Sequence, residues 1–365
     1  MALADIARSF EEKANRSGIV KRRREGWLPK ITPYSGYGSV HAVKILARAT
    51  MADPNRHNHD FELGHLPFNA HSFAANAFRD FAERKATARR GWHQFFTTQV
   101  GFLPVTVRIG AQEFKTSTDR NGYVNLLVEN HGLEPGWHEV EIIPAAGAAV
   151  KAPVMIVSPD ASFGLVSDVD DTVLVTWLPR AILAAWNSFV MHTNTRQAVP
   201  GMNKLYGQVL MGTPDAPVFY LSTGAWNTYS TLMEFIESND LPVGPLLMTD
   251  WGPTPTGLFR SGIEHKKTQL RNLLIMFPHI EWMLVGDDGQ HDPLIYADLA
   301  AEHPSRVKAI LLRELDPIEQ VLSHGTVESA KAERKDSDIS SRGVPIVRGR
   351  DGYELLSHLD DLSDA

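Results

Sequence analysis

Residues 164–173 read GLVSDVDDTV, an apolar run that leads directly into three carboxylates within four positions. Like charges this close repel one another and raise each other's pKa values. A hard cation such as Mg²⁺, which prefers oxygen ligands, would relieve that repulsion. The stretch therefore suggests a metal-assisted reaction at the end of a β-strand.

The composition is that of a soluble globular protein. The chain has 365 residues, of which 43% are hydrophobic and 22% are charged, so it can form about two domains with sizeable cores. A formal net charge of −7 argues against general nucleic-acid binding, which usually requires a basic surface. The absence of cysteine excludes disulfides, thiolate metal sites and a cysteine nucleophile.

No segment of the sequence predicts a signal peptide or a membrane-spanning helix. Residues 1–17 are mixed and charged, and no stretch approaches the roughly 18 continuous apolar residues that a span requires. We therefore expect a cytoplasmic protein, which would contact a membrane only peripherally if its substrate is a lipid.

The first part of the chain shows mostly short β-strand patterns. Residues 1–30 predict a helical segment with a basic cluster, Lys21–Arg24, which could contact anionic lipid or phosphate or simply be a solvated helix end. Residues 31–153 contain strand-like runs between Gly- and Pro-rich turns, and they predict a small β-rich, sandwich-like domain. Phenylalanines at helical spacing predict a helical insertion at about 71–90.

Strand and helix patterns alternate from residue 154 onward. This alternation predicts a Rossmann-like parallel sheet flanked by helices over residues 154–325. Right-handed crossovers would place the carboxyl ends of its strands along one edge, where ligands bind. Residues 326–365 indicate a flexible loop and a C-terminal segment, with Val344–Val347 as a candidate last strand. The predicted strands are residues 154–157, 163–166, 217–221, 282–285 and 307–312, and the predicted helices are residues 180–192, 226–238, 266–277 and 293–302.

Four polar segments follow predicted strands or open a predicted helix in this part of the chain. In order, they present a carboxylate pair, a hydroxyl, a lysine and a Gly-Asp pair. This ordered set resembles the four-motif pattern of the haloacid-dehalogenase-like phosphohydrolases, and it implies an α/β fold of that kind. The segments are Asp168–Thr172, Leu221–Gly224, His265–Lys266 and Gly286–Asp288 with Asp292 beyond.

The resemblance implies the chemistry of phosphate-ester hydrolysis, which requires a nucleophile, an acid for the leaving group and positive charge around the phosphoryl group. It implies that Asp168 is the nucleophile and forms an aspartyl-phosphate, and that Asp170 is the general acid and then the general base. It also implies Mg²⁺ held by Asp168, the backbone carbonyl of Asp170, and Asp287. An acid at position 170 favours a phosphatase over the phosphoryl-transferring ATPases and the dehalogenases of the same superfamily.

The same resemblance implies a phosphate-binding role for Ser222, Thr223 and Lys266, with the lysine as a compact point charge. Ser222 could instead cap the following helix, and Lys267 could replace Lys266 as the motif lysine. Asp292 could orient Lys266 or a metal-bound water, or it could only cap a helix. Further candidates are Thr172 as a loop-fixing residue, Asp171 and Asp288 as metal ligands or solvated carboxylates, and His265 and His291 as substrate-binding or structural residues.

Several longer stretches together resemble the catalytic domain of the actin-patch-associated phosphatidate phosphatase family, and Pro33–Gly38 resembles that family's upstream domain. The resemblance implies a Mg²⁺-dependent phosphatase that converts phosphatidate to diacylglycerol. The sequence departs from the family at Gly224-Ala225, where a proline is common, and at Asp288 and Gln290, where Ser and Glu are common. The stretches are residues 167–172, 220–227, 241–247, 265–266 and 285–293.

We therefore expect a phosphatidate phosphatase that meets its substrate at a membrane surface and has no nucleic-acid partner. Two alternatives stay open: a phosphatase for a soluble or protein-borne phosphomonoester, and a lipid- or protein-binding scaffold with a residual phosphatase domain. An apolar helix after the nucleophile loop could face the lipid or be an ordinary cap or core helix. Its apolar residues are Trp177, Leu178, Ile182, Leu183, Trp186 and Phe189.

Overall fold

The computed structural model describes residues 18–53, 98–175, 197–249, 262–288, 291–316 and 343–363. These residues divide into two compact units that meet in the sequence between Pro159 and Asp160. Within the described ranges, no helix is long and apolar enough to cross a membrane. Several predictions fall outside these ranges: the segment 1–17, the insertion at 71–90, the helix at 180–192 with its apolar residues 177–189, and the loop at 326–342.

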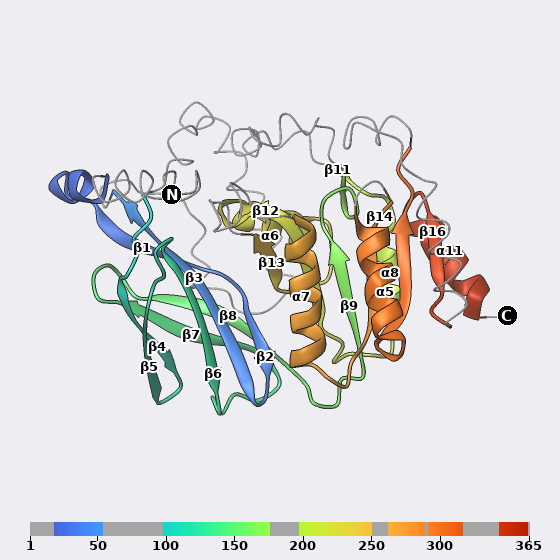
Figure 1. Cartoon of the computed structure of the whole chain (residues 1–365), viewed down its shortest axis with the longest axis horizontal. Helices are drawn as coiled ribbons and strands as arrows, with labels where there is room; N and C mark the ends of the chain where they lie inside the picture. Colours follow the sequence, from blue (N-terminus) through green and yellow to red (C-terminus); the bar gives the residue numbers. More distant parts are fainter. Residues whose placement is uncertain are drawn as a thin grey trace, which may run out of the picture. The chain divides into compact units, whose positions relative to one another are not determined.

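The first unit is built on one hydrogen-bonded sheet of eight strands (Figure 1). The strands pair in the order β1-β3-β2-β8-β7-β4-β5, and β6 pairs with β3. Alternate residues of β4 are buried, as its period of two predicts, and the inward side chains of most strands form one apolar core. The β-rich character is confirmed, whereas a sandwich-like arrangement stays a prediction. The strands are β1 (Leu28–Pro33), β2 (Gly36–Ser39), β3 (Ala42–Ala52), β4 (Pro104–Ile109), β5 (Gln112–Ser117), β6 (Tyr123–Glu129), β7 (Gly136–Pro144) and β8 (Val150–Val157).

Strand β8 corrects one prediction about the second domain. Residues 154–157 were expected to open that domain, but β8 pairs in parallel with β2 and antiparallel with β7 of the first sheet. Its residues from Ala152 onward are all buried. An apolar run that is buried throughout carries no polar alternation that would indicate which sheet it joins. The two units therefore meet after Pro159 rather than between residues 153 and 154.

The second unit contains a six-stranded sheet in which every neighbouring pair is parallel. The strand order is β13-β12-β9-β14-β15-β16, so the first strand of the sheet in sequence lies in its middle, as in doubly wound α/β sheets. This arrangement confirms the predicted parallel sheet. A short pair, β10 (Leu174–Val175) with β11 (Gln197–Ala198), stands apart from it. The main strands are β9 (Phe163–Asp168), β12 (Val218–Ala225), β13 (Leu246–Thr249), β14 (Glu281–Asp287), β15 (Val307–Arg313) and β16 (Ile346–Gly349).

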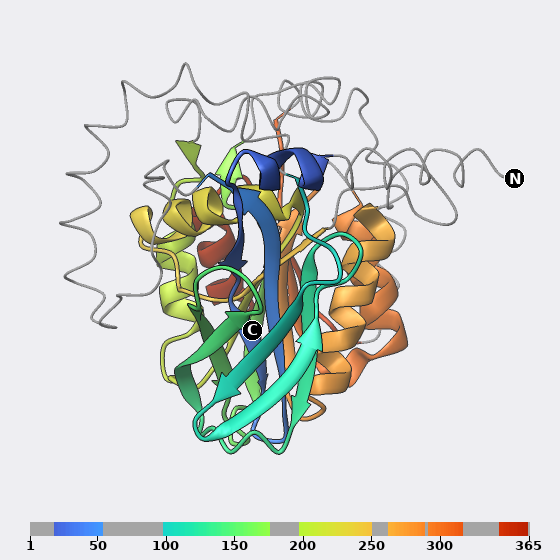
Figure 2. The same cartoon turned by 90° about the vertical axis from the view of Figure 1, so that its left-hand side faces the viewer.

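Helices flank this sheet, as predicted. Helix α7 packs beside α8, and α5 packs beside α11, with the two pairs on opposite faces (Figure 2). Helix α7 begins at Gly262 rather than at Lys266 as predicted. The helices are α5 (Met202–Val209), η3 (Trp226–Thr228), α6 (Tyr229–Ser238), α7 (Gly262–Met276), α8 (Asp292–Glu302), η4 (Pro304–Arg306) and α11 (Gly352–Ser363).

Residues 343–363 complete the second unit. Strand β16 pairs in parallel with β15, two residues later than the predicted strand at 344–347, and α11 follows it. The sequence patterns do not predict α5, β13 or α11. Helix α5 contains Gly207, which lowers its helix propensity, and β13 has only four residues, too few for a periodic pattern.

An aromatic cluster lies near the amino ends of the parallel strands. The ring of Phe219 is 5.8 Å from those of Phe277 and Trp282, which are themselves 6.1 Å apart between centroids. All three side chains are buried. This end of the sheet is therefore fixed by apolar packing, whereas polar side chains gather at the carboxyl ends.

Candidate active site

The carboxyl edge of the parallel sheet brings the predicted motif residues together. Asp168 is the last residue of β9, Asp287 is the last residue of β14, and Ser222 lies in the second half of β12. Strand β9 is the point from which the chain continues to either side of the sheet. Ligands of open α/β sheets bind at such a switch point.

Lys266 joins two aspartates by buried ion pairs. Its Nζ lies 2.6 Å from Oδ1 of Asp168 and 2.5 Å from Oδ1 of Asp292. Each of the three side chains is at most 5% exposed. The neighbouring lysine, Lys267, instead pairs with Asp298 at the partly exposed surface, at 3.1 Å. The structure therefore places Lys266, and not the alternative Lys267, beside the predicted nucleophile.

Asp168, Asp287 and Asp292 could hold a metal ion together. One carboxylate oxygen of each lies within 4.8 Å of the others, and all three residues are buried. Oδ2 of Asp292 is buried and accepts no hydrogen bond from any residue that the structure describes. Three carboxylates with a buried acceptor to spare fit a hard divalent cation such as Mg²⁺.

Gly286 explains why the fourth motif pairs a glycine with an aspartate. A Cβ atom at this position would lie 2.6 Å from Oδ2 of Asp292 and 2.8 Å from the ring of Tyr296. A side chain at this position would force the Asp292 carboxylate and the Tyr296 ring to shift. Asp292 is the first residue of α8, whose N-cap is His291, so helix capping does not account for Asp292.

Electrostatics at this edge favour a bound cation. Burial raises the pKa of Asp168; Lys266 opposes this effect, and Asp292 and Asp170 add to it. Burial also raises the pKa of Asp287, with Asp292 and Asp168 adding to the effect. Although burial disfavours the charged form of Lys266, the three carboxylates outweigh it and raise the pKa of that ammonium. One ammonium thus faces several buried carboxylates, and further positive charge would stabilise them.

Asp170 lies beside the hydroxyl motif rather than in the carboxylate cluster. Oγ of Ser222 donates a hydrogen bond to Oδ2 of Asp170 at 3.1 Å and accepts one from the amide of Gly224 at 3.0 Å. The N-cap of the following η3 is Ala225, so Ser222 does not cap that helix. The hydroxyl and the acid predicted to handle the phosphoryl group therefore lie within hydrogen-bond distance of each other.

The turn that carries Thr223 is fixed from the neighbouring strand. Oγ1 of Thr249, at the end of β13, donates to the carbonyl oxygens of Thr223 at 2.9 Å and Gly224 at 3.2 Å. The pairing of β12 with β13 shifts register between Leu221 and Ala225. Sequence analysis did not identify Thr249 as a site residue. The available indication was a hydroxyl side chain at the end of a short apolar run, Leu246–Thr249.

In the loop after β9, Thr172 and Asp171 make different contacts. Oγ1 of Thr172 lies 3.4 Å from Oδ2 of Asp168, consistent with a loop-fixing role. Asp171 has a positive φ of 60°, its amide donates to Leu174, and its carbonyl accepts a hydrogen bond from Nη1 of Arg313 at 2.8 Å.

Two further contacts hold the loops around the site. The hydroxyl of Ser167 donates to the carbonyl of Asp168 at 2.6 Å and lies 2.6 Å from the hydroxyl of Tyr206 in α5. Oδ1 of Asp288 accepts a hydrogen bond from the amide of Leu315 at 2.9 Å, which is a structural role. Sequence reasoning missed Tyr206 because it did not predict α5.

The candidate His265 and three aromatic residues that follow the hydroxyl motif have mostly structural contacts. A ring nitrogen of His265 lies 3.2 Å from the carbonyl of Leu247, and the side chain is buried. Tyr229 and Phe235 are buried core residues. The ring of Trp226 lies 6.1 Å from that of Tyr229, between centroids.

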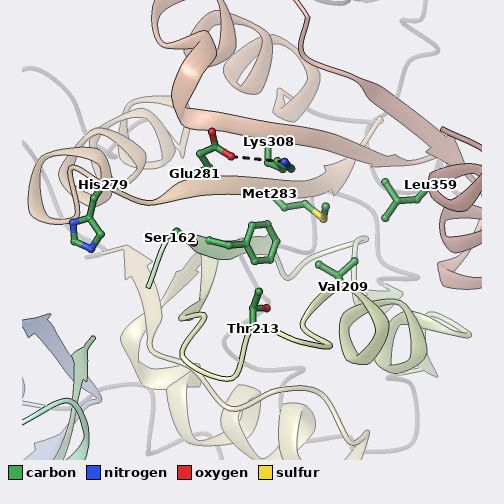
Figure 3. Close-up of a pocket in the computed structure, with 9 residues that line it drawn as sticks. Ser162, Val209, Thr213, His279, Glu281, Met283, Lys308 and Leu359 are labelled. Atoms are coloured by element: carbon green, nitrogen blue, oxygen red, sulfur yellow. Dashed lines mark ion pairs between the residues drawn. The ribbon is translucent and has the colours of Figure 1, made fainter. Parts of the chain in front are cut away.

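A cavity of about 620 Å³ lies at the opposite, amino edge of the sheet (Figure 3). Phe163, Glu281 and Lys308, which line it, belong to the first residues of β9, β14 and β15. The predicted catalytic carboxylates lie at the far ends of the same strands. We therefore place the active site at the carboxyl edge, where the charged groups converge, and not in this cavity. The other lining residues are Ser162, Val209, Thr213, His279, Met283 and Leu359.

The fold and the site define an α/β protein with a buried carboxylate–lysine centre that fits a divalent cation. Residues 163–314 match the family model described as "Phosphatidate phosphatase APP1, catalytic domain". The predicted resemblance to this catalytic-domain family is confirmed, and the matching segment contains every candidate catalytic residue named above.

Two curated relatives extend this match. Phosphatidate phosphatase APP1 of Saccharomyces cerevisiae is 29% identical over 162 residues, which are 44% of this chain and 27% of that protein. An uncharacterized protein of Schizosaccharomyces pombe is 22% identical over 152 residues, 41% of this chain and 25% of that one. The chain thus spans about a quarter of the length of each relative.

Among solved structures, a carbohydrate acetylesterase from Xanthomonas citri aligns with a TM-score of 0.32 and 8% identity, over 87% of this chain and 66% of that chain. A score this low supports no argument about fold or function.

Proposed function

We propose that the chain is a Mg²⁺-dependent phosphatidate phosphatase with a haloacid-dehalogenase-like catalytic unit. The observation that carries the proposal is the buried Asp168–Lys266–Asp292 arrangement beside Asp287, inside the segment that matches the phosphatidate phosphatase catalytic domain. The chain spans only about a quarter of the length of its relatives. We therefore also propose its substrate, its cytoplasmic location and its peripheral contact with a membrane.

In the first step, a carboxylate oxygen of Asp168 attacks phosphorus, and the bond from phosphorus to the diacylglycerol oxygen breaks. Asp170 gives its proton to that leaving oxygen, so diacylglycerol departs neutral. The enzyme is left as an aspartyl-phosphate on Asp168. Ser222, which contacts Asp170 in the structure, can redirect its hydroxyl hydrogen to a phosphoryl oxygen when the substrate enters.

In the second step, water attacks the phosphorus of the aspartyl-phosphate and Asp170 takes the proton of that water. The bond from phosphorus to Asp168 breaks, which releases inorganic phosphate and restores the carboxylate. Lys266 stays charged throughout, because neighbouring carboxylates raise its pKa, and it offsets negative charge on Asp168 and the phosphoryl group.

Asp168, Asp287 and the backbone carbonyl of Asp170 would hold Mg²⁺, with Asp292 as a further carboxylate of the same cluster. When bound, the ion supplies positive charge next to the transferring phosphoryl group. Asp292 also holds Lys266 in place through its other oxygen.

The deciding experiment measures phosphate release from phosphatidate vesicles with Mg²⁺ and with EDTA, beside a panel of soluble phosphomonoesters. We expect Mg²⁺-dependent release from the vesicles that an Asp168→Asn variant lacks. Turnover of soluble esters without turnover of phosphatidate would instead identify a soluble-substrate phosphatase. A protein that hydrolyses none of them and forms no beryllofluoride adduct on Asp168 would be a scaffold with a residual domain.

A further inference from the structure

Arg313 ties three segments together at the carboxyl edge. It is the last residue of β15, it is 5% exposed, and in the sheet it lies opposite Asp287. Its Nη1 donates to the carbonyl of Asp171 at 2.8 Å, and its Nε donates to the carbonyl of Arg350 at 3.1 Å. Its own carbonyl accepts a hydrogen bond from the amide of Asp288 at 2.9 Å.

These contacts join the nucleophile loop to the C-terminal segment. Asp171 follows the predicted acid Asp170, and Arg350 links β16 to α11. The amide of Glu314 also donates to Gly349 at 2.9 Å. The C-terminal segment lies outside the residues that match the family model, yet the guanidinium of Arg313 connects it to the loop of the nucleophile.

The contact suits arginine better than lysine. A planar guanidinium carries several donors in a fixed fork and can serve two carbonyls at once, whereas an ammonium is a compact point charge on a flexible stem. Asp171 has the left-handed backbone conformation, which persists in a loop only where the surroundings hold it. Without Arg313, the Asp171 carbonyl would lose the side-chain donor that reaches it from β15.

We propose that Arg313 is a positioning residue that holds the nucleophile loop in the geometry required for proton transfer by Asp170. The proposal rests on the proposed phosphatase function. Arg313 acts through the Asp171 carbonyl, so its loss affects the chemical step more than substrate binding. A displacement of about 1 Å in a catalytic group can cost roughly 10²-fold in rate.

Arg306 offers a matched control at the other end of the same strand. It lies in η4, immediately before β15, and its Nε donates to the carbonyl of Ile280 at 3.0 Å. Its Nη2 donates to the carbonyl of Phe277 at 2.6 Å. Arg306 therefore makes the same kind of bonds as Arg313, but at the edge away from the carboxylates.

The experiment compares the full-length Arg313→Met, Arg313→Lys and Arg306→Met variants in two measurements. We expect Arg313→Met to lower kcat by about 10- to 100-fold with little change in KM, and Arg313→Lys to recover part of the loss. Arg306→Met should keep kcat within about twofold. Amide hydrogen exchange should become faster at residues 169–175 in Arg313→Met but not in Arg306→Met.

Hydrogen exchange needs no turnover, so the two proposals can fail separately. If the wild-type protein hydrolyses no phosphomonoester, the proposed function fails, and exchange still decides whether Arg313 holds the loop. Unchanged exchange at residues 169–175 in the Met variant would overturn the inference. So would faster exchange with unchanged kcat, or equal losses of kcat in the Arg313 and Arg306 variants. If Arg313→Met does not fold, Arg313→Lys carries the same comparison.

Discussion

The two ends of strand β15 use the same residue type for different purposes. Arg306 precedes the strand and binds backbone carbonyls of Phe277 and Ile280, close to the aromatic cluster. Arg313 ends the strand and binds the carbonyl of Asp171, one residue after the predicted acid Asp170. Both arginines donate hydrogen bonds to backbone carbonyls, but Arg306 binds beside the aromatic cluster and Arg313 binds the loop that carries the proposed nucleophile.

The same contrast runs across the whole parallel sheet. The amino edge is fixed by apolar packing and by exposed ion pairs such as Lys308–Glu281, at 3.9 Å, and exposed pairs contribute little to stability. At the carboxyl edge, several aspartates and one lysine are buried together, an arrangement that is costly unless the charges are matched. The proposed function depends on the buried charges of the carboxyl edge, while apolar packing holds the amino edge.

The largest expected effect comes from removing the nucleophile. Asp168→Asn should lower kcat for phosphate release by at least about 10⁴-fold, because the nucleophile has no substitute in the cluster. Glu281→Gln, at the amino end of β14, should leave kcat unchanged. Steady-state phosphate release by both variants measures the contrast, and substantial turnover by Asp168→Asn would contradict the proposed nucleophile.

The adjacent lysines give the next contrast. Lys266→Met leaves Asp168 and Asp292 buried without their ammonium, so we expect a loss of about 3–5 kcal/mol in unfolding free energy and about 10²-fold in kcat. Lys267→Met removes only the partly exposed pair with Asp298, which is worth about 0–1 kcal/mol. Urea unfolding and phosphate release test both variants. Equal losses in the two would contradict the role of Lys266 as the charge partner of Asp168 and Asp292.

The contrast between the edges also explains which features the sequence could predict. The parallel sheet follows from local apolar patterns. The resemblance implied Asp168, Ser222, Lys266 and Asp287, because these residues stand in short motifs at or near the end of a strand or in the second turn of a helix. The partners of Arg313 could not be predicted in this way, since 142 residues separate it from Asp171. A charged residue that ends a buried parallel strand, as in ILLR at residues 310–313, was the available signal.

Other failures have physical causes of the same kind. Strand β8 is buried from Ala152 onward, so its apolar sequence does not indicate which sheet it joins. The role of Asp292 was ambiguous because a carboxylate before Pro293 is equally suited to a helix cap. Only the position of Lys266 on the neighbouring helix α7 shows that the carboxylate is directed to the site.

A smaller effect is expected at the glycine of the fourth motif. Gly286→Ala places a Cβ atom 2.6 Å from Oδ2 of Asp292, so the carboxylate must move and the cation site is distorted. We expect Mg²⁺ to raise the Tm of the wild-type protein by mass action and to raise that of Gly286→Ala much less. Gly207→Ala, in α5, meets no atom within 4 Å; it should gain about 0.5–1 kcal/mol and keep the full Mg²⁺ shift.

Thermal unfolding with and without Mg²⁺ measures this difference, and an equal Mg²⁺ shift in both glycine variants would contradict the assignment of Asp292 to the cation site. The site would then consist of Asp168 and Asp287 without it.

The smallest expected effect is a pH dependence that lies outside the catalytic cluster. Burial, with a contribution from Glu234, raises the pKa of Glu237 in α6 to about 7. Between its ordinary value of 4.5 and about 7, the folded protein keeps a proton that the unfolded chain releases. Stability therefore falls as the pH rises through this window, and the full cost is present above pH 7.

Glu237→Gln should consequently stabilise the protein at pH 8 by about 1 kcal/mol, after allowance for the partial exposure of the carboxyl group, and should bring no gain at pH 4. Glu354 provides the opposite sign, because its hydrogen bonds with Arg350 lower its pKa to about 2. Its contribution is present above about pH 4.5 and is lost as the pH falls toward 2, so Glu354→Gln should destabilise the protein at pH 8. Urea unfolding at both pH values measures these shifts. Since neither residue belongs to the cluster of Asp168, a change in kcat in either variant would show that the chemistry extends beyond the carboxyl edge.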